Sequence, residues 1–333
     1  MGQPTIKDVA KLAGVSISTV SRVMNNSKPV SPEARQKVLD AIAKLDFKPN
    51  ELARSLVMRK SNLVGVIVED LGIEYMAQLI RGVEEIGRVY KYDILLQSSY
   101  GNEEALNNSI DFLATKQVEG LIIITENLTD ETLIKLRETR IPFILLDKYH
   151  AYKNLNTVRI DYKKEQYNLT KYLFDMGHEN VLYIGNKDDN ELNRAKFAGY
   201  KEAIKELEKE RFILKIDGLN SDDGYNIGEE AINLCKKNNI TAVSLMNDEV
   251  AIGFIDYCTD NGIKVPNDLS VAGFGDSSIA SIYRPNLTTV SIPYYDIGAI
   301  SIRALIKRIK NEEEILLNDW VMECSIVARE SSK

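Results

Sequence analysis

Hydrophobic residues in the first fifty positions recur at the three- and four-residue spacing of amphipathic helices. The predicted helices lie within residues 7–13, 16–25 and 31–47. Their predicted core residues are Val9, Leu12, Ala13, Val20, Val23, Met24, Val38, Ile42 and Leu45. The predicted N-caps are Thr5, Ser16 and Ser31. Gly14 suits a tight turn between the first two helices, so the pattern predicts a small all-α helix-turn-helix module.

After residue 60 the pattern changes to apolar strands that alternate with helical stretches. The strands of a first series are NLVGVIVED, YDILLQSS, VEGLIIIT and IPFILLD. A second series begins near NTVRIDY and continues with NVLYIGN, AVSLMND and LSVAGFG. Two series of such units predict an α/β core of two doubly wound parallel subdomains. A ligand would bind in the crevice at the carboxyl ends of the strands.

The distribution of charge along the chain indicates a negatively charged binding partner for the N-terminal residues. The 333-residue chain has a net charge of −7, yet residues 1–60 contain eleven Lys and Arg against five Asp and Glu. Residues 1–60, called the head, therefore carry a net charge of +6, and the remaining residues carry −13. This difference favours a head that binds a polyanion. The three cysteines lack C-x-x-C spacing, and the first residues have no apolar signal segment. We therefore expect free thiols, a cytoplasmic location and no membrane association.

The second predicted helix has one face suited to duplex DNA. Ile17 is placed to touch a thymine methyl group, Ser18 to bond a base edge, and Arg22 to donate to guanine O6 and N7. The residues better placed for phosphates are Ser16, Thr19 and Asn25. Thr5 completes the predicted contacts of the head. The alternative is a three-helix interaction domain with a solvated polar face.

The sequence resembles the LacI/GalR family of bacterial transcription regulators along its whole length. TIKDVAKLAGVSISTVSRVMNN, VSPEARQKVLDAIAKLDFKPN and LARSL lie at the family's usual distances from the N-terminus. The resemblance implies a core like that of periplasmic sugar-binding proteins, with three crossovers between subdomains, near residues 160, 290 and 320. The predicted domains are a helix-turn-helix domain at 1–48, a hinge at 49–60, an N-terminal subdomain at 61–160 with 291–320, and a C-terminal subdomain at 161–290 with 321–333.

Residues 49–60 contain helix formers but too little apolar surface to fold alone. In the resembled family this segment is a hinge helix that orders on DNA as a pair from two subunits. The resemblance implies that Leu56 wedges into the minor groove, at the centre of the site, and that Asn50 and Ala53 also contact DNA. The alternative is a plain linker.

Strand-end position and the resemblance together predict an effector cleft. Its predicted lining is Ile73, Tyr75, Asp147, Asp161, Lys196, Asn247, Asp248 and Asp276. Sugar-responsive family members have an arginine where this chain has Lys196, often an aromatic ring at Leu219, and commonly an aspartate at Gly275. Lysine cannot form the bidentate hydrogen bonds of arginine, so these differences argue against ordinary sugar or purine binding. Strand-end aspartates also have a simpler role as caps of the following helix.

RGVEEIGRVYKYDILL, KQVEGLIII and PYYDIGAISIRALIKRIK resemble the catabolite control proteins of low-GC Gram-positive bacteria. Their main corepressor is the seryl-phosphorylated phosphocarrier HPr, which docks on the N-terminal subdomain. The resemblance implies partner contacts by Tyr295, Asp296, Arg303 and Lys307. The two basic residues are spaced i, i+4 and form a basic patch on an acidic body, which suits a phosphoserine. The alternative is a solvated helix face beside a dimer interface.

Catalysis is not expected. G-x-S-x-G, Walker A and G-x-G-x-x-G motifs are absent, and the two histidines, His150 and His178, have no neighbouring metal-ligand set. The predicted function is sequence-specific regulation, mainly repression, of carbon-metabolism genes by a homodimer that binds pseudo-palindromic operators. No cofactor is expected, and activity is set by an unidentified small effector or by a corepressor protein. The alternatives are a repressor of one operon that responds to a sugar or sugar phosphate and, more remotely, a solute-binding protein.

Overall fold

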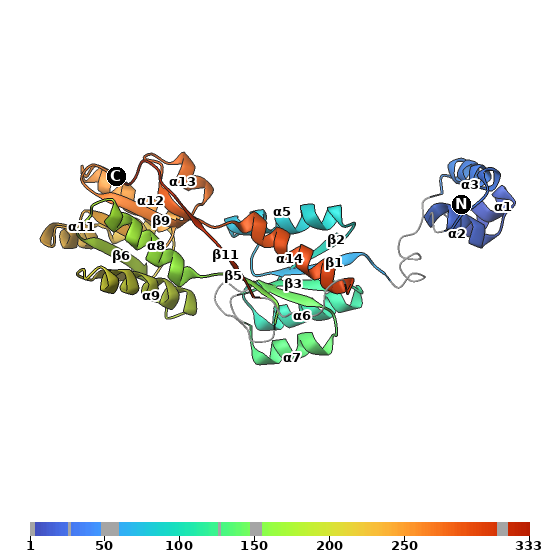
Figure 1. The fold of residues 1–333 in the computed structure, drawn as a ribbon, viewed down its shortest axis with the longest axis horizontal. Helices are drawn as coiled ribbons and strands as arrows, with labels where there is room; N and C mark the ends of the chain where they lie inside the picture. The colour runs from blue at the N-terminus through green and yellow to red at the C-terminus, as the bar shows by residue number, and fades with distance from the viewer. Residues whose placement is uncertain (1–3, 26–27, 48–59, 126–127, 147–154, 312–318) are drawn as a thin grey trace. The chain divides into compact units, whose positions relative to one another are not determined.

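The computed structural model describes residues 4–25, 28–47, 60–125, 128–146, 155–311 and 319–333. The chain forms two compact units, Met1–Ser61 and Asn62–Lys333, which are described separately (Figure 1). The predicted contacts Asn50, Ala53, Leu56 and Asp147 lie outside the described residues, as does the side chain of Asn25.

The first unit is the predicted helix-turn-helix module. Its helices are α1 (Ile6–Ala13), α2 (Ile17–Asn25) and α3 (Pro32–Leu45). Their buried core consists of Val9, Ala10, Ala13, Val20, Val23, Val38, Ala41 and Phe47. The prediction that Leu12 faces this core is wrong: its side chain is 51% exposed, whereas Ala10 is 6% exposed. α1 is rotated toward Ala10 because it packs against both α2 and α3, so its buried stripe is centred between Val9 and Ala10.

The first sheet of the second unit is entirely parallel, in the order β11-β5-β4-β3-β1-β2. Its strands are β1 (Leu63–Val68), β2 (Asp93–Ser98), β3 (Gly120–Ile124), β4 (Phe143–Leu146), β5 (Thr157–Ile160) and β11 (Asp319–Met322). Helices α5 (Glu74–Val89) and α14 (Tyr294–Ile309) cover one face, and α6 (Glu103–Thr115) and α7 (Asp130–Glu138) cover the other (Figure 1). This sheet and its helices are called the first lobe.

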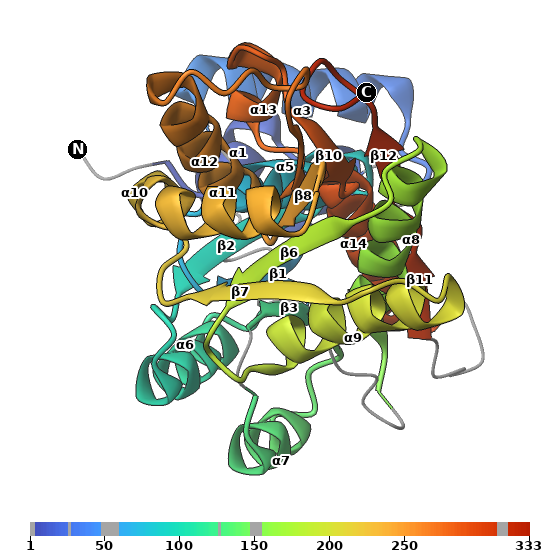
Figure 2. The same ribbon diagram turned by 90° about the vertical axis from the view of Figure 1, so that its left-hand side faces the viewer.

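The second sheet has the order β12-β10-β9-β8-β6-β7. Its strands are β6 (Val181–Asn186), β7 (Phe212–Ile216), β8 (Ala242–Leu245), β9 (Ser270–Gly275), β10 (Thr288–Ser291) and β12 (Ser325–Val327). Its helices are α8 (Tyr162–Asp175), α9 (Glu191–Glu206), α10 (Ser221–Asn226), α11 (Gly228–Lys237), α12 (Asp248–Asp260) and α13 (Ser278–Ile282). Figure 2 shows α11 and α12 on one side of β6, and α8 and α9 on the other. This sheet and its helices are called the second lobe.

The predicted α/β core of two doubly wound sheets is confirmed, with one difference. β12 pairs antiparallel with β10, because the chain enters the second sheet directly from β11 and no helix intervenes to reverse it. Strand pairing places the chain crossings between β5 and α8, between β10 and α14, and between β11 and β12. The predicted subdomain boundaries near these crossings stay predictions.

Helices α5 and α14 lie against each other at a distance set by two glycines. A Cβ atom on Gly82 would lie 2.1 Å from the backbone oxygen of Tyr295, and one on Gly298 would lie 2.0 Å from that of Leu79. These separations leave no room for any side chain. The two backbones are therefore in direct contact, and the helix pair is expected to move as one body.

Gly82→Ala should lower the free energy of unfolding by about 1–3 kcal/mol, because the added methyl group forces the two backbones apart. Urea unfolding followed by circular dichroism measures this change. Val89→Ala, at an exposed position of the same helix, is the control and should change stability by less than about 0.5 kcal/mol. Equal stability of Gly82→Ala and wild type would contradict the direct contact.

A bidentate ion pair between Arg159 on β5 and Asp319 on β11 holds β11 to the first sheet. Arg159 Nε lies 2.9 Å from Asp319 Oδ1, and Arg159 Nη2 lies 2.8 Å from Asp319 Oδ2. The Thr157 hydroxyl also donates to Oδ1 over 2.8 Å. The hydrogen bond from Arg159, then that from Thr157, lowers the pKa of Asp319 below its usual 3.8, against the opposing effect of burial.

A lowered pKa in the folded state means that ionised Asp319 stabilises the fold above pH 3.8 and that this contribution is lost as pH falls through the folded-state pKa. Asp319→Asn should therefore cost up to about 1 kcal/mol at neutral pH, a small value because the carboxylate side chain is 36% exposed. The difference from wild type should shrink steadily below pH 4 in denaturant titrations. A difference that does not change with pH would contradict the assignment.

Candidate functional site

The exposed face of α2 carries the side chains that the sequence predicts for DNA. Ile17 is 45% exposed, and Ser16, Ser18 and Arg22 are exposed. Val20, on the opposite side of the helix, is fully buried in the core of the module. The helix therefore presents short hydroxyl groups, one apolar group and one long cation to its surroundings, as a reader of the major groove requires.

The hydroxyl groups at the start of α2 are held by one another. Ser16 Oγ lies 2.8 Å from Ser18 Oγ and 2.9 Å from Thr19 Oγ1, and it accepts a hydrogen bond from the Thr19 backbone N–H over 3.2 Å. Ser16 thus caps the helix as predicted. At the start of α1 the Thr5 hydroxyl donates to Asp8 over 2.7 Å, and this bond lowers the pKa of the Asp8 carboxyl. Both helix starts are therefore held by hydrogen bonds within the module itself.

A cavity of about 400 Å³ lies between the two lobes. Of the predicted effector-cleft residues, the structure brings together Ile73, Tyr75, Lys196, Asn247, Asp248 and Asp276 in its lining. The lining also includes side chains that the sequence reasoning did not place there: Glu74, Gln78, Tyr162, Leu192, Glu249, Phe274, Ser277, Ile292 and Tyr294. Leu219 and Gly275, the positions that depart from the sugar-responsive pattern, line it too.

Aromatic rings form much of this lining. The Tyr75 and Tyr294 rings are stacked with centroids 4.6 Å apart, and those of Tyr162 and Phe274 lie 5.9 Å apart. These rings fall in strands and helices whose hydrophobic pattern resembles that of an ordinary core. Only their nearness to strand ends was available as a sequence signal.

Lys196 is directed into the second lobe. Its side chain is 5% exposed, Nζ donates to the Met246 carbonyl over 2.8 Å, and it lies 3.8 Å from the centroid of the Phe274 ring. A carbonyl and an aromatic face both favour an enclosed ammonium group. In this arrangement Lys196 holds α9 to the floor of the cleft.

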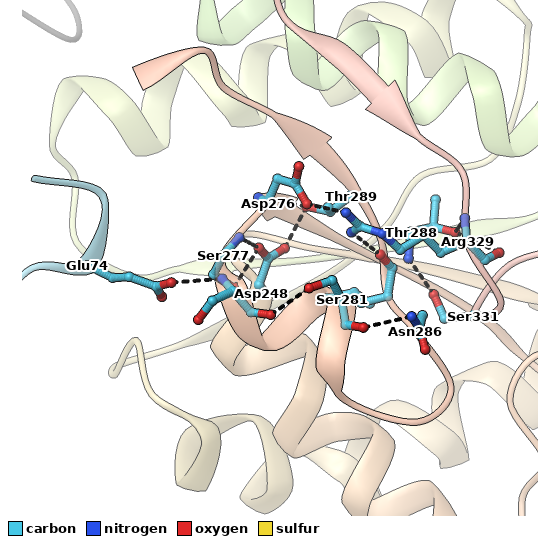
Figure 3. A network of polar contacts seen from close by, with 12 residues as sticks. Glu74, Asp248, Asp276, Ser277, Ser281, Asn286, Thr288, Thr289, Arg329 and Ser331 are labelled. Atoms are coloured by element: carbon cyan, nitrogen blue, oxygen red, sulfur yellow. Dashed lines mark hydrogen bonds and ion pairs between the residues drawn. The ribbon is translucent and has the colours of Figure 1, made fainter. Parts of the chain in front are cut away.

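Asp248 is the most enclosed carboxylate of the cleft, with 2% of the residue exposed. It accepts hydrogen bonds from the Ser277 backbone N–H (2.7 Å), the Ser277 hydroxyl (2.9 Å) and the Thr289 hydroxyl (2.6 Å) (Figure 3). Burial raises the pKa of the Asp248 carboxyl above its usual value, although all three bonds act in the other direction. The donors are needed because a buried carboxylate without partners is strongly unfavourable.

Asp276 faces the C-terminal segment of the chain. Its carboxylate pairs with Arg329 Nη2 at 2.5 Å. The backbone turns sharply just before this pair, with φ of +134° at Gly275 and +55° at Asp276. Glycine suits the first of these angles, which L-residues rarely adopt, so Gly275 allows the turn that leads into Asp276.

Asp161 does not line the cavity. Its carboxylate accepts a hydrogen bond from the Lys164 backbone N–H over 3.0 Å and caps α8, which is the alternative role of a strand-end aspartate. Asn247 has both roles. It caps α12 through Val250, donates to the Leu219 carbonyl over 2.8 Å, and lines the cavity.

The predicted partner-binding residues lie on α14. Asp296 and Arg303 are exposed, and Lys307 is partly exposed. Tyr295 donates to Glu85 on α5 over 2.9 Å, and Glu85 also pairs with Arg81. Tyr295 is therefore part of the surface that α5 and α14 share, while the basic residues Arg303 and Lys307 follow about two and about three turns further along α14.

Neither the requirements of a metal site nor those of a membrane-spanning helix are met within the described ranges. Among these residues, no group of three or more His, Cys, Asp or Glu side chains is placed to hold a metal ion. His178 Nδ1 contacts the Thr241 hydroxyl at 2.8 Å. No helix in the same ranges is both long enough and apolar enough to cross a membrane.

A helix-turn-helix module joined in one chain to a two-lobed core with a central cavity defines a transcription regulator of the ligand-responsive class. Comparison with known proteins makes this specific. Residues 5–50 match the model of the lacI family of bacterial regulatory proteins, and residues 170–332 match that of the periplasmic binding protein-like domain. The chain belongs to the LacI family of bacterial transcription regulators.

Its relatives include catabolite control protein A of Priestia megaterium, with 36% identity over 92% of this chain and 93% of that protein. The HTH-type transcriptional regulator RegA of Clostridium saccharobutylicum is 35% identical over 98% and 99% of the two chains. Among solved structures, the lac repressor dimer bound to operator matches with a TM-score of 0.86 at 24% identity, over 99% of both chains. The regulator CcpA of Lactococcus lactis matches with a TM-score of 0.69 at 29% identity, over 81% and 99%.

Arg22→Ala should reduce the preference for an operator-like palindrome over random duplex by about tenfold to a hundredfold, since the predicted bidentate contact to guanine would be lost. Binding to random duplex should remain, with its steep dependence on salt. Fluorescence anisotropy at three salt concentrations measures both quantities. Lys44→Ala removes one positive charge from exposed α3 and should leave the preference intact. An equal loss of preference in the two variants would assign Arg22 a purely electrostatic role.

Proposed function

We propose that this protein is a sequence-specific regulator, mainly a repressor, of carbon-metabolism genes. It binds pseudo-palindromic operators in the cytoplasm as a homodimer. The observation that supports this most directly is the likeness to catabolite control protein A and RegA over nearly the whole chain, together with the exposed reading face of α2. We assign base contacts to Ile17, Ser18 and Arg22, and phosphate contacts to the residues around them.

The hinge and dimer parts of the proposal rest on family resemblance. Asn50, Ala53 and Leu56 contact DNA when the segments from two subunits pair, and Leu56 is the wedge in the minor groove. The lac repressor dimer on its operator, to which the fold is similar, supports this arrangement.

The core is proposed to receive its signal from the seryl-phosphorylated HPr phosphocarrier protein. The residues from 61 onward carry a net charge of −13, yet the end of α14 combines Arg303, Lys307 and Arg308 within two turns. A phosphoserine, with close to two negative charges, pairs well with such a cluster and poorly with the rest of the surface. Tyr295 and Asp296 begin the same helix and complete the proposed contact surface.

The alternative is a repressor of one operon that takes a sugar or sugar phosphate in the cleft. The cavity of about 400 Å³ favours it by size. Against it, the polar groups at the predicted ligand positions already have partners: Lys196 bonds Met246, Asp248 bonds Ser277 and Thr289, and Asp276 pairs with Arg329. A polyhydroxy ligand would have to share or displace these partners, so we rank this function second.

The deciding experiment is a titration of operator DNA with the regulator, in the presence of phosphorylated HPr, unphosphorylated HPr or a panel of sugar phosphates. Tightening by the phosphorylated protein alone supports the proposal. Release from the operator by a sugar or sugar phosphate supports the alternative. Absence of any operator preference would refute both.

Arg303→Ala should leave operator affinity without the partner unchanged and reduce the tightening by phosphorylated HPr about tenfold or more, because a charge-assisted contact to phosphate is lost. Arg137→Ala, which removes an exposed arginine from α7 on the other face of the first sheet, is the matched control. If both variants respond to phosphorylated HPr like wild type, the partner does not use this face of α14.

A further inference from the structure

A hydrogen bond joins the two lobes beside the cleft. Glu74, the first residue of α5 in the first lobe, accepts the backbone N–H of Ser278 over 2.8 Å. Ser278 is the first residue of α13 in the second lobe. Figure 3 shows the Glu74 side chain extending toward the segment that contains Ser277. The two residues are 204 positions apart in the chain, so their contact depends on the relative position of the lobes.

The first N–H of α13 takes its acceptor from the other lobe, and α13 has no side-chain cap of its own. Ser277 occupies its N-cap position, but the Ser277 hydroxyl donates to Asp248, and no side chain of the same segment accepts from the first turn. The first backbone N–H groups of a helix need an acceptor. Here a carboxylate from the other lobe accepts the N–H of the first helical residue, which an N-cap side chain, bonding the second or third N–H, does not reach.

The second-lobe side of this contact is held firmly in place. Ser277 is bonded to Asp248 through both its backbone N–H and its hydroxyl. Asp248 accepts from Thr289 on β10, whose hydroxyl in turn accepts the Asp276 backbone N–H over 3.3 Å. Asp276 is paired with Arg329. A continuous series of contacts therefore runs from the C-terminal segment to the start of α13 (Figure 3).

The C-terminal segment is itself fixed to the sheet. Arg329 Nη1 donates to the Leu287 carbonyl over 2.8 Å, and its backbone N–H donates to the Thr288 hydroxyl over 2.9 Å. Ser331 is fully buried and bonds the backbone of Val271. The Ser278 N–H is therefore expected to move with the second lobe as a rigid body. Glu74 is expected to move with α5 and the first lobe.

We propose that Glu74 is a closure latch: it caps α13 when the lobes are closed and loses this partner when they separate, so that the chain's own contacts favour the closed cleft without a bridging ligand. In an open arrangement both groups return to water, and the Ser278 N–H loses its acceptor within the protein. The latch concerns the core alone. Its consequence for DNA binding, that closure presets the regulator for its corepressor, rests on the proposed function.

Hydrogen exchange of the full-length protein, read by mass spectrometry without DNA or ligand, tests the latch. Glu74→Ala should speed exchange at least about threefold in residues 276–283, and also in the first-lobe cleft segment 72–80, because an open cleft exposes both sides. Glu74→Gln, which keeps an acceptor but removes the charge, should give a smaller effect. Glu249→Ala, at an exposed acidic residue that also lines the cavity, is the matched control and should leave both segments unchanged.

Each other outcome overturns the latch. Faster exchange confined to residues 276–283 makes Glu74 a local cap without control of closure. Unchanged exchange in Glu74→Ala, or an equal change in Glu249→Ala, removes any specific role for Glu74. Operator binding of the same samples is measured separately, so failure of the latch and failure of the proposed function give different results.

Discussion

The buried carboxylate of Asp248 constrains the backbone and the hydrogen-bond donors on the second-lobe side of the cleft. A carboxylate that is 2% exposed is tolerated only with donors at close range, and the chain supplies them from two other elements, the start of α13 and β10. To reach Asp248, the Ser277 backbone must turn inward directly after β9, and this requires the unusual backbone angles at Gly275 and Asp276. The turn then directs the Asp276 carboxylate toward Arg329. The contacts of Asp248 and of its neighbours thus connect the end of β9, the start of α13 and the C-terminal segment.

The first lobe is organised by a different constraint, the direct backbone contact of α5 and α14 at Gly82 and Gly298. α14 follows the second chain crossing, and α5 carries Glu74 at its N-terminus. Because the two helices cannot shift past each other without backbone collision, a partner on the exposed face of α14 and a contact at Glu74 act on the same rigid body. The packing of α5 against α14 therefore connects the proposed docking face on α14 with Glu74 at the cleft.

The sequence predicts most of the fold, because helical periodicity and apolar strand runs are local signals. It predicts the polar face of α2 for the same reason: Val20 and Val23 identify the buried side, and the opposite side follows. It misplaces Leu12, because only the angle at which α1 meets its two neighbours decides between Leu12 and Ala10. The cleft shows the same limit. Asp161 and Asp248 both follow strands, yet one caps a helix at the surface and the other is buried in the lining. The direction of β12 and the inward orientation of Lys196 are also tertiary outcomes that no local pattern encodes.

A core that closes through its own contacts changes what a signal has to do. A ligand shifts a two-state equilibrium only by its differential affinity for the two states. When the polar groups of the cleft bond to one another and Glu74 spans the lobes, the closed state is already favoured. A protein partner bound outside the cleft then needs only a modest difference in affinity to complete the shift. A small ligand in the cleft would instead have to compete with Lys196, Asp248 and Asp276 for the partners that they already hold. The distribution of bonded groups in the core therefore favours control from its surface over control from its interior.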